Sequence, residues 1–114
     1  MNAEATRRML RLVGLGVRSR GAVVGVEQVR DAVRKGKVVL AVVAHDASVH
    51  SVAKVVPLLE ARPVRILRPA SATDLGHAGG REQAAAVGIV DRQLAKGIRA
   101  LMDSGPAVDQ KEEG

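Results

Sequence analysis

The 114-residue chain contains no cysteine and no Phe, Tyr or Trp. Without cysteine there is neither a disulfide framework nor thiolate chemistry. The three histidines (His45, His50 and His77) show no established zinc spacing, so neither a metal site nor a cofactor is expected from them. The lack of aromatic rings excludes the RNA-binding modules that stack bases on such side chains. The hydrophobic core must therefore consist of Val, Leu, Ile, Ala and Met.

Long hydrophobic runs are also missing. No window approaches the roughly 20 apolar residues of a membrane span, so no membrane partner is expected. The early arginines are not followed by a long apolar segment with a cleavage site, so we expect no signal peptide and a cytoplasmic protein. The length suits one domain, which we place at residues 1–103. Residues 104–114 are polar and acidic, and we expect them to form a disordered tail.

The segment that organises the chain is Val38–Ala44, which has seven apolar residues, four of them β-branched. Such a run predicts a strand buried on both faces. Before it, Val26–Lys35 carries Val at helical spacing, which predicts an amphipathic helix. After it, Asp46 and Ser48 are candidate N-caps of a helix that runs towards Glu60 and is kinked or broken at Pro57. A helix, a buried strand and a helix predict a layered α/β domain.

The remaining elements follow from the same signals. A helix is predicted from Ala3 to about Val17, a short helix is capped by Ser71 or Thr73, and a last helix is capped by Asp91. The predicted strands are Ala22–Val24, Val64–Leu67 and Ala84–Val90, and Ser104-Gly105-Pro106 is predicted to end the last helix.

The positive charge is concentrated near the N-terminus. Residues 1–37 hold nine Lys or Arg and three acidic residues, while residues 38–114 hold nine of each. The whole net charge of +6 therefore belongs to the first third of the chain. A one-sided basic surface is typical of proteins that bind a polyanion, and the alternative is a solvated surface that keeps the protein soluble.

Motifs of catalysis are weak in this sequence. Gly14-Leu15-Gly16 lacks the third glycine of a dinucleotide fingerprint, and no phosphate-binding loop of the Walker type occurs. Asp46 and Asp91 each follow a predicted strand, so both acids could lie on one edge of the sheet and hold Mg²⁺ for phosphoryl transfer. Both are also well placed as helix caps, which we favour. We therefore expect a protein that is not an enzyme.

Several separated segments resemble a known family. The block Val33–Ser48 is similar to the most characteristic segment of the small bacterial YlxQ-like proteins. Further similar segments stand in the same order and at matching distances: Leu12–Leu15, Arg20–Gly25, Asp74–Gly80 and Val87–Asp91. These proteins belong to the kink-turn RNA-binding superfamily of ribosomal proteins, the L-seven-Ae and L-thirty-e group. The resemblance extends over residues 8–101.

The resemblance implies a three-layer α/β/α sandwich around a mixed four-stranded sheet, and RNA binding without catalysis. A helix N-terminus offers free amides and a positive dipole to phosphate, and an Arg side chain can form two hydrogen bonds with a phosphate or a guanine edge. The candidate RNA-binding residues lie at the start of the second helix, near the central strand and in the loop before the last strand: Gly25, Val26, Glu27, Gln28, Arg30, Asp31, Lys37, Asp46, Gly79, Gly80, Arg81, Glu82, Gln83 and Ala84.

Three positions depart from the family pattern. Glu27-Gln28 stand where kink-turn binders usually have Asn-Glu, and Asp31 stands where they have Lys. An ionised Glu27 cannot donate a hydrogen bond, and Asp31 repels phosphate, although both acids also stabilise the first turns of a helix. We therefore expect binding to ribosomal or other structured RNA, with the ribosome or transcription and translation factors as further partners. The rival hypothesis is a protein-interaction module of the same fold that has lost RNA affinity.

Overall fold

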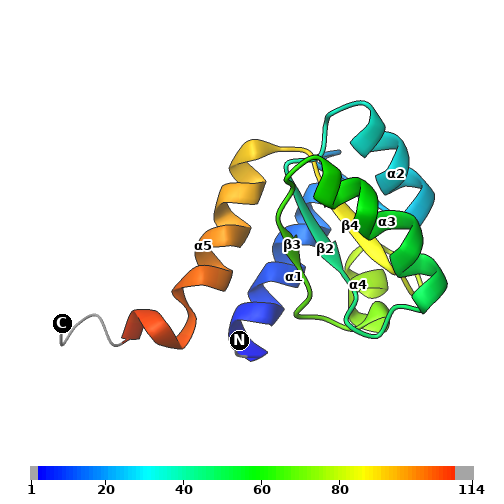
Figure 1. Cartoon of the computed structure of the whole chain (residues 1–114). Coiled ribbons are helices and arrows are strands. Elements are labelled where there is room, and N and C mark those ends of the chain that lie inside the picture. Colours follow the sequence, from blue (N-terminus) through cyan, green and yellow to red (C-terminus); the bar gives the residue numbers. More distant parts are fainter. Residues whose placement is uncertain (1–2, 110–114) are drawn as a thin grey trace.

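The computed structural model describes residues 3–109, with side chains described through Asp103, and alternates helices with strands (Figure 1). Every element that the sequence predicts is present. In chain order they are α1 (Ala3–Arg18), β1 (Ala22–Val24), α2 (Val26–Arg34), β2 (Leu40–Val43), α3 (Val49–Ala61), β3 (Ile66–Leu67), α4 (Ala72–Ala78), β4 (Ala86–Ile89) and α5 (Arg92–Asp109).

The four strands form one mixed sheet in the order β1-β4-β2-β3. Strand β4 is antiparallel to both β1 and β2, whereas β2 and β3 are parallel. In the central pair, Leu40 lies opposite Ile89 and Val43 lies opposite Ala86. Consequently the start of β4 lies beside the end of β2, a relationship that determines which loops meet.

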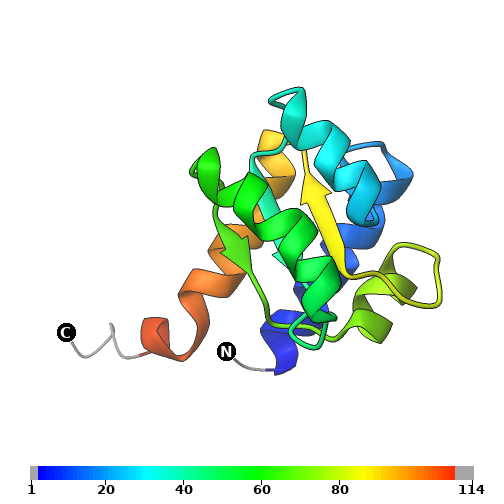
Figure 2. The same ribbon diagram turned by 45° about the vertical axis from the view of Figure 1, so that its right-hand side comes forward.

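Helices cover both faces of the sheet and bury the central strand between them (Figures 1 and 2). Leu40 and Val42 of β2 belong to the core shared with α1, α4 and α5. Ala41 and Val43 point to the other face and join the core shared with α2 and α3. All four are buried, so the strand predicted to be covered on both faces is confirmed. The three-layer α/β/α sandwich around a mixed sheet is likewise confirmed.

Helix α3 begins where the sequence predicted, because the Ser48 side chain accepts a hydrogen bond of 3.1 Å from the amide of Ser51. The helix then continues through Pro57 without the predicted break. Proline removes one helical hydrogen bond, which costs about 3 kcal/mol in an unsupported helix. Here Val55 and Leu59 on either side of the proline are buried in the core, and this packing holds the helix together.

Helix α5 begins at a predicted cap and ends later than predicted. Asp91 Oδ1 accepts hydrogen bonds from the amides of Gln93 (2.8 Å) and Leu94 (3.1 Å). The helix extends to Asp109, past the predicted stop at Ser104-Gly105-Pro106. As in α3, one proline removes a single helical hydrogen bond, and the helix continues beyond it. Of the predicted disordered tail, residues 110–114 lie outside the described residues. No helix within residues 3–109 combines the length and apolarity needed to cross a membrane.

Candidate nucleic-acid interface

The start of α2 depends on Gly25, whose φ of 108° lies in the left-handed region that side-chain-bearing residues rarely adopt. The Gly25 amide donates to Ala86 O at 2.9 Å and joins α2 to the start of β4. The Gly25 carbonyl accepts from the amide of Val29 at 2.9 Å. As N-cap, Gly25 places no side-chain oxygen over the first amides of the helix. Those amides and the positive end of the helix dipole remain available to an anion.

Arg81, from the loop before β4, lies against this glycine. A Cβ built on Gly25 would be 3.2 Å from Arg81 Nη1 and 2.5 Å from Gln28 Oε1. The two predicted recognition segments therefore meet at one place, with a guanidinium beside a helix N-terminus. Because both groups attract anions, this arrangement suits a phosphate or the acceptor edge of a base.

The loop from Gly79 to Ala84 is held by α4. Arg81 donates its amide to Gly76 O at 2.8 Å, and Ala84 donates its amide to Ala72 O at 3.0 Å. Gly80 donates to His77 O at 3.1 Å, and Gly79 packs against Val24 of β1, where a Cβ would be 2.7 Å from Val24 Cγ2. The loop is thus positioned by hydrogen bonds to α4 and by the packing of Gly79 on β1.

Gly76 was not among the predicted site residues, yet it determines where this loop runs. A Cβ at position 76 would be 2.6 Å from both the N and the C atom of Gln83, closer than side-chain carbons approach a backbone. The backbone of the loop therefore passes over α4 where the helix has no side chain. A glycine inside a short predicted helix is the sequence signal that could have indicated this contact.

Asp46 connects the loop after β2 to α4, since its Oδ1 accepts a hydrogen bond of 2.8 Å from the amide of Ala72. It borders a hollow of about 480 Å³ between the start of α2 and the end of the loop. Of the predicted residues, Gly25, Val26, Asp46, Gln83 and Ala84 line this hollow, together with the unpredicted Ala47, Ser48, Ser51, Ala72 and Ala85. Glu82 and Gln83 line a second hollow with His77, of about 620 Å³.

The charged residues of α2 make contacts within the protein. Arg30 donates to Lys54 O at 2.7 Å and thereby joins α2 to α3. Glu27 lies 3.6 Å from both Arg30 Nε and Lys54 Nζ, and Asp31 forms an exposed ion pair of 3.0 Å with Lys35. Arg30, which is only 25% exposed, consequently has a structural role beside any contact with RNA.

Lys37 is not brought to the same place. It follows the C-terminal end of α2, where its amide donates to Ala32 O at 3.0 Å, whereas Gly25 precedes the N-terminal end. Helix α2, which lies between the two residues in the chain, is labelled in Figure 1.

The hypothesis of a Mg²⁺ site on Asp46 and Asp91 is wrong. Asp46 follows β2, and Asp91 follows β4. Because these two strands are antiparallel, their C-terminal ends point in opposite directions, so the two acids lie at opposite ends of the strands. Each carboxylate instead accepts amide hydrogen bonds at the start of a helix. Among residues 3–103, whose side chains the structure describes, there is no group of three or more His, Cys, Asp or Glu side chains that could hold a metal ion.

The basic first third of the chain does not form one surface. Arg7, Arg8 and Arg11 belong to α1, on one face of the sheet, whereas Arg34 and Lys35 belong to α2 or its end, on the other face. A count of charge along the sequence cannot distinguish these faces. The arginines of α1 therefore require a separate explanation.

The fold is a small α/β/α domain in which Gly25 and the loop Gly79–Ala84 lie side by side. The chain belongs to the ribosomal protein L7Ae/L30e/S12e/Gadd45 family, whose model matches residues 7–98. No curated protein matches the sequence.

Solved structures share this architecture. A protein of unknown function from Bacillus halodurans is 29% identical, with a TM-score of 0.75, over 83% of this chain and 96% of that one. The 15.5kD RNA-binding protein of Giardia lamblia is 22% identical, with a TM-score of 0.76, over 95% of this chain and 92% of that one. The likeness to the Giardia lamblia protein shows a shared fold.

Proposed function

We propose that this protein binds structured RNA without catalysing a reaction, and that the RNA contacts the start of α2 and the loop Gly79–Ala84. The observation that carries the proposal is the apposition of Arg81 and Gly25. It places a cation that can form two hydrogen bonds beside the open amides of a helix. Family membership supports RNA as the ligand, as does the shared fold of the Giardia lamblia RNA-binding protein.

The target we propose is ribosomal or another structured RNA that differs from a standard kink-turn. Glu27 and Asp31 place two carboxylates on the exposed side of α2, 68% and 64% exposed, within the recognition segment. These acids disfavour a close phosphate at that part of the helix. We further place the protein in the YlxQ-like subgroup, in the cytoplasm and in association with the ribosome or with transcription or translation factors.

The direct test is titration of the full chain with a kink-turn RNA, a bulged stem-loop and a plain duplex at several salt concentrations. Binding through phosphate contacts should weaken with salt, with a log–log slope of about −0.7 to −0.9 per phosphate neutralised. Tighter binding to either structured RNA than to the duplex supports binding of structured RNA, and a preference for the kink-turn over the bulged stem-loop would overturn the proposal that the target differs from a kink-turn. Absence of binding to all three at low salt would overturn it and favour a protein-interaction module. Crosslinking in cells, followed by sequencing of the bound RNA, would then identify the target.

A further inference from the structure

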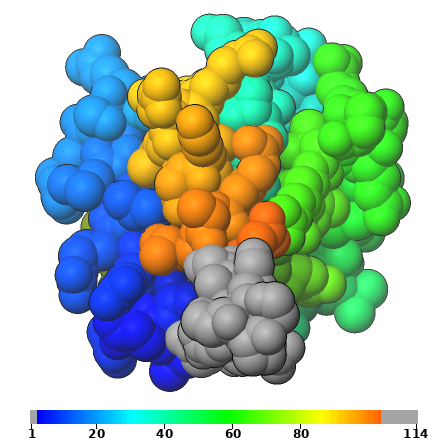
Figure 3. Space-filling view, turned by 90° about the vertical axis from the view of Figure 1, so that its left-hand side faces the viewer, coloured from blue at the N-terminus to red at the C-terminus, as the bar shows by residue number. Residues whose placement is uncertain are grey.

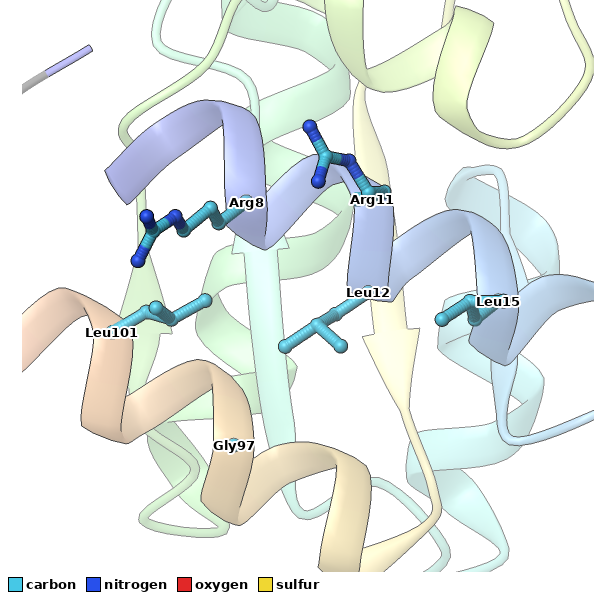
Figure 4. A pocket seen from close by; sticks show the side chains of 6 residues that line it. All are labelled: Arg8, Arg11, Leu12, Leu15, Gly97 and Leu101. Carbon is cyan, nitrogen blue, oxygen red and sulfur yellow. The ribbon is translucent and has the colours of Figure 1, made fainter. Parts of the chain in front are cut away.

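A second surface lies on the other side of the sheet, where α1 and α5 pack side by side in antiparallel directions (Figure 3). A groove of about 380 Å³ runs along their seam. Leu12 and Leu15 of α1 and Gly97 and Leu101 of α5 line it, with Arg8 and Arg11 alongside (Figure 4). The α1 residues 8, 11, 12 and 15 follow the spacing of a single helix face.

The groove exists because α5 has no side chain at Gly97, where the helix faces α1. Leu94 fills the space above Gly16, so the two helices are closely packed at that end. Further along, Gly97 contributes no side chain, and a Cβ there would meet only Leu12 Cδ1, at 3.5 Å. The leucines of α1 are left partly uncovered, and Leu15 remains 51% exposed. Such exposure of an apolar residue inside a groove is typical of a binding surface.

The surroundings of the groove are positively charged. Helix α1 carries four arginines and one glutamate, Glu4, which already pairs with Arg7 and Arg8. Residues 92–103 of α5 add Arg92 and Lys96, whereas Arg99 donates to Val39 O, and the single acid, Asp103, pairs with Arg65. An apolar floor with a basic margin is complementary to an apolar stripe flanked by carboxylates.

We propose that this groove binds an acidic amphipathic helix supplied by another protein. Leu or similar apolar side chains of the partner helix, at helical spacing, would enter the groove. Glu or Asp on either side of them would pair with Arg8 and Arg11. A second copy of this chain does not fit, since two basic faces would repel each other. The proposed RNA-binding residues lie at the start of α2, whereas the groove lies on the opposite face of the sheet. Binding of RNA phosphates would not require the apolar floor of the groove. The proposal is independent of the RNA-binding function.

The test uses the full chain and synthetic helical peptides of about 18 residues, long enough for five turns. The first peptide has Leu at i, i+3, i+4 and i+7, Glu on the flanks of this stripe and Ala elsewhere. The second replaces Glu by Lys, and the third replaces Leu by Ser. Anionic vesicles and a plain RNA duplex serve as competing ligands. Calorimetry or fluorescence anisotropy with labelled peptide measures each dissociation constant.

Two exposed substitutions locate the binding site. Leu15→Glu and Arg11→Glu should each weaken binding of the acidic peptide by about tenfold or more, because each adds a carboxylate to the groove. The matched control is Val49→Glu, since Val49 on α3 is 86% exposed and lies away from the groove. It should bind like the unchanged protein. Circular dichroism and the melting temperature verify that all three variants are folded.

The outcomes separate the hypotheses. Binding of the acidic peptide alone, lost with Leu15→Glu and Arg11→Glu but not with Val49→Glu, establishes the groove. Equal binding of the acidic and basic peptides, or no effect of the two groove variants, would overturn the proposal. Binding of vesicles or duplex that depends on Leu15, without binding of the acidic peptide, would also overturn it. That last outcome would assign the groove to binding of a lipid surface or of RNA.

Discussion

Gly76 lies directly beneath the backbone of Gln83, so that a Cβ on the glycine would be 2.6 Å from the Gln83 amide nitrogen. This contact joins α4 to the loop that presents Arg81, whose own amide donates to Gly76 O. One glycine therefore controls both the stability of the loop and the position of a candidate RNA-binding side chain.

Gly76→Ala should destabilise the protein by about 1–3 kcal/mol, because the added methyl group meets backbone that cannot move without loop displacement. RNA binding should weaken as well. Gly97→Ala is the control: its methyl group meets only an ordinary contact, so better helix propensity should stabilise α5 by about 0.5–1 kcal/mol. Urea unfolding measures both, and equal effects of the two substitutions would contradict the role of Gly76.

Arg81→Ala should weaken RNA binding by roughly 1–3 kcal/mol if its guanidinium makes two hydrogen bonds to one group. Arg81 is exposed, so its loss should change the free energy of unfolding by less than about 0.5 kcal/mol. Arg81→Lys keeps the charge and should recover only part of the affinity. Filter binding on a kink-turn RNA and a plain duplex is the measurement. Unchanged affinity in Arg81→Ala would mean that RNA contacts a different surface.

Asp31→Lys should tighten binding to a kink-turn RNA, because it replaces a repulsive charge by the cation that kink-turn binders have there. Adding Glu27→Asn should tighten it further, since an amide can both donate and accept. The lost ion pair with Lys35 is exposed, so its cost in stability should stay within about 0.5 kcal/mol. Binding is measured on both RNAs. Equal gains on kink-turn and duplex would show that only overall charge changed.

Stability in acid should depend on the pair formed by Arg65 and Asp103, which joins the segment before β3 to α5. Hydrogen bonds from Arg65 lower the pKa of the Asp103 carboxyl below its ordinary value of 3.8. The carboxylate therefore contributes stability at neutral pH, and this contribution is lost as the pH falls through the lowered pKa. The melting temperature of Asp103→Asn should be lower than that of the unchanged chain at pH 7, and the difference should shrink as the pH falls below the ordinary Asp value of 3.8 and through the lowered pKa.

The pH experiment has an internal control. Glu4, whose pKa is lowered chiefly by a hydrogen bond from Arg7, titrates with the same sign, so the unchanged protein alone cannot isolate Asp103. Arg65→Gln should reproduce the effect of Asp103→Asn, and the double variant should add little. Additive losses from the two substitutions would show that the side chains do not stabilise each other.

Local and periodic features of this protein were determined by the sequence alone. The apolar run around Leu40 and Val43 predicted a strand buried on both faces, because its alternate residues leave no polar side for solvent. The caps formed by Ser48, Ser71 and Asp91 were also predicted, since a cap contacts amides only two or three residues away. The ends of helices were less predictable, because buried neighbours such as Val55 and Leu59 can carry a helix past a proline.

Relationships between distant segments were decided only by the tertiary structure. Antiparallel pairing of β2 with β4 separated Asp46 from Asp91, although both follow buried strands. The antiparallel pairing of β1 with β4 brought Gly25 beside the loop of Arg81, while the packing of α1 on one face of the sheet separated Arg7, Arg8 and Arg11 from that site. Strand direction and the choice of face depend on contacts across many residues, and no short window of sequence contains them.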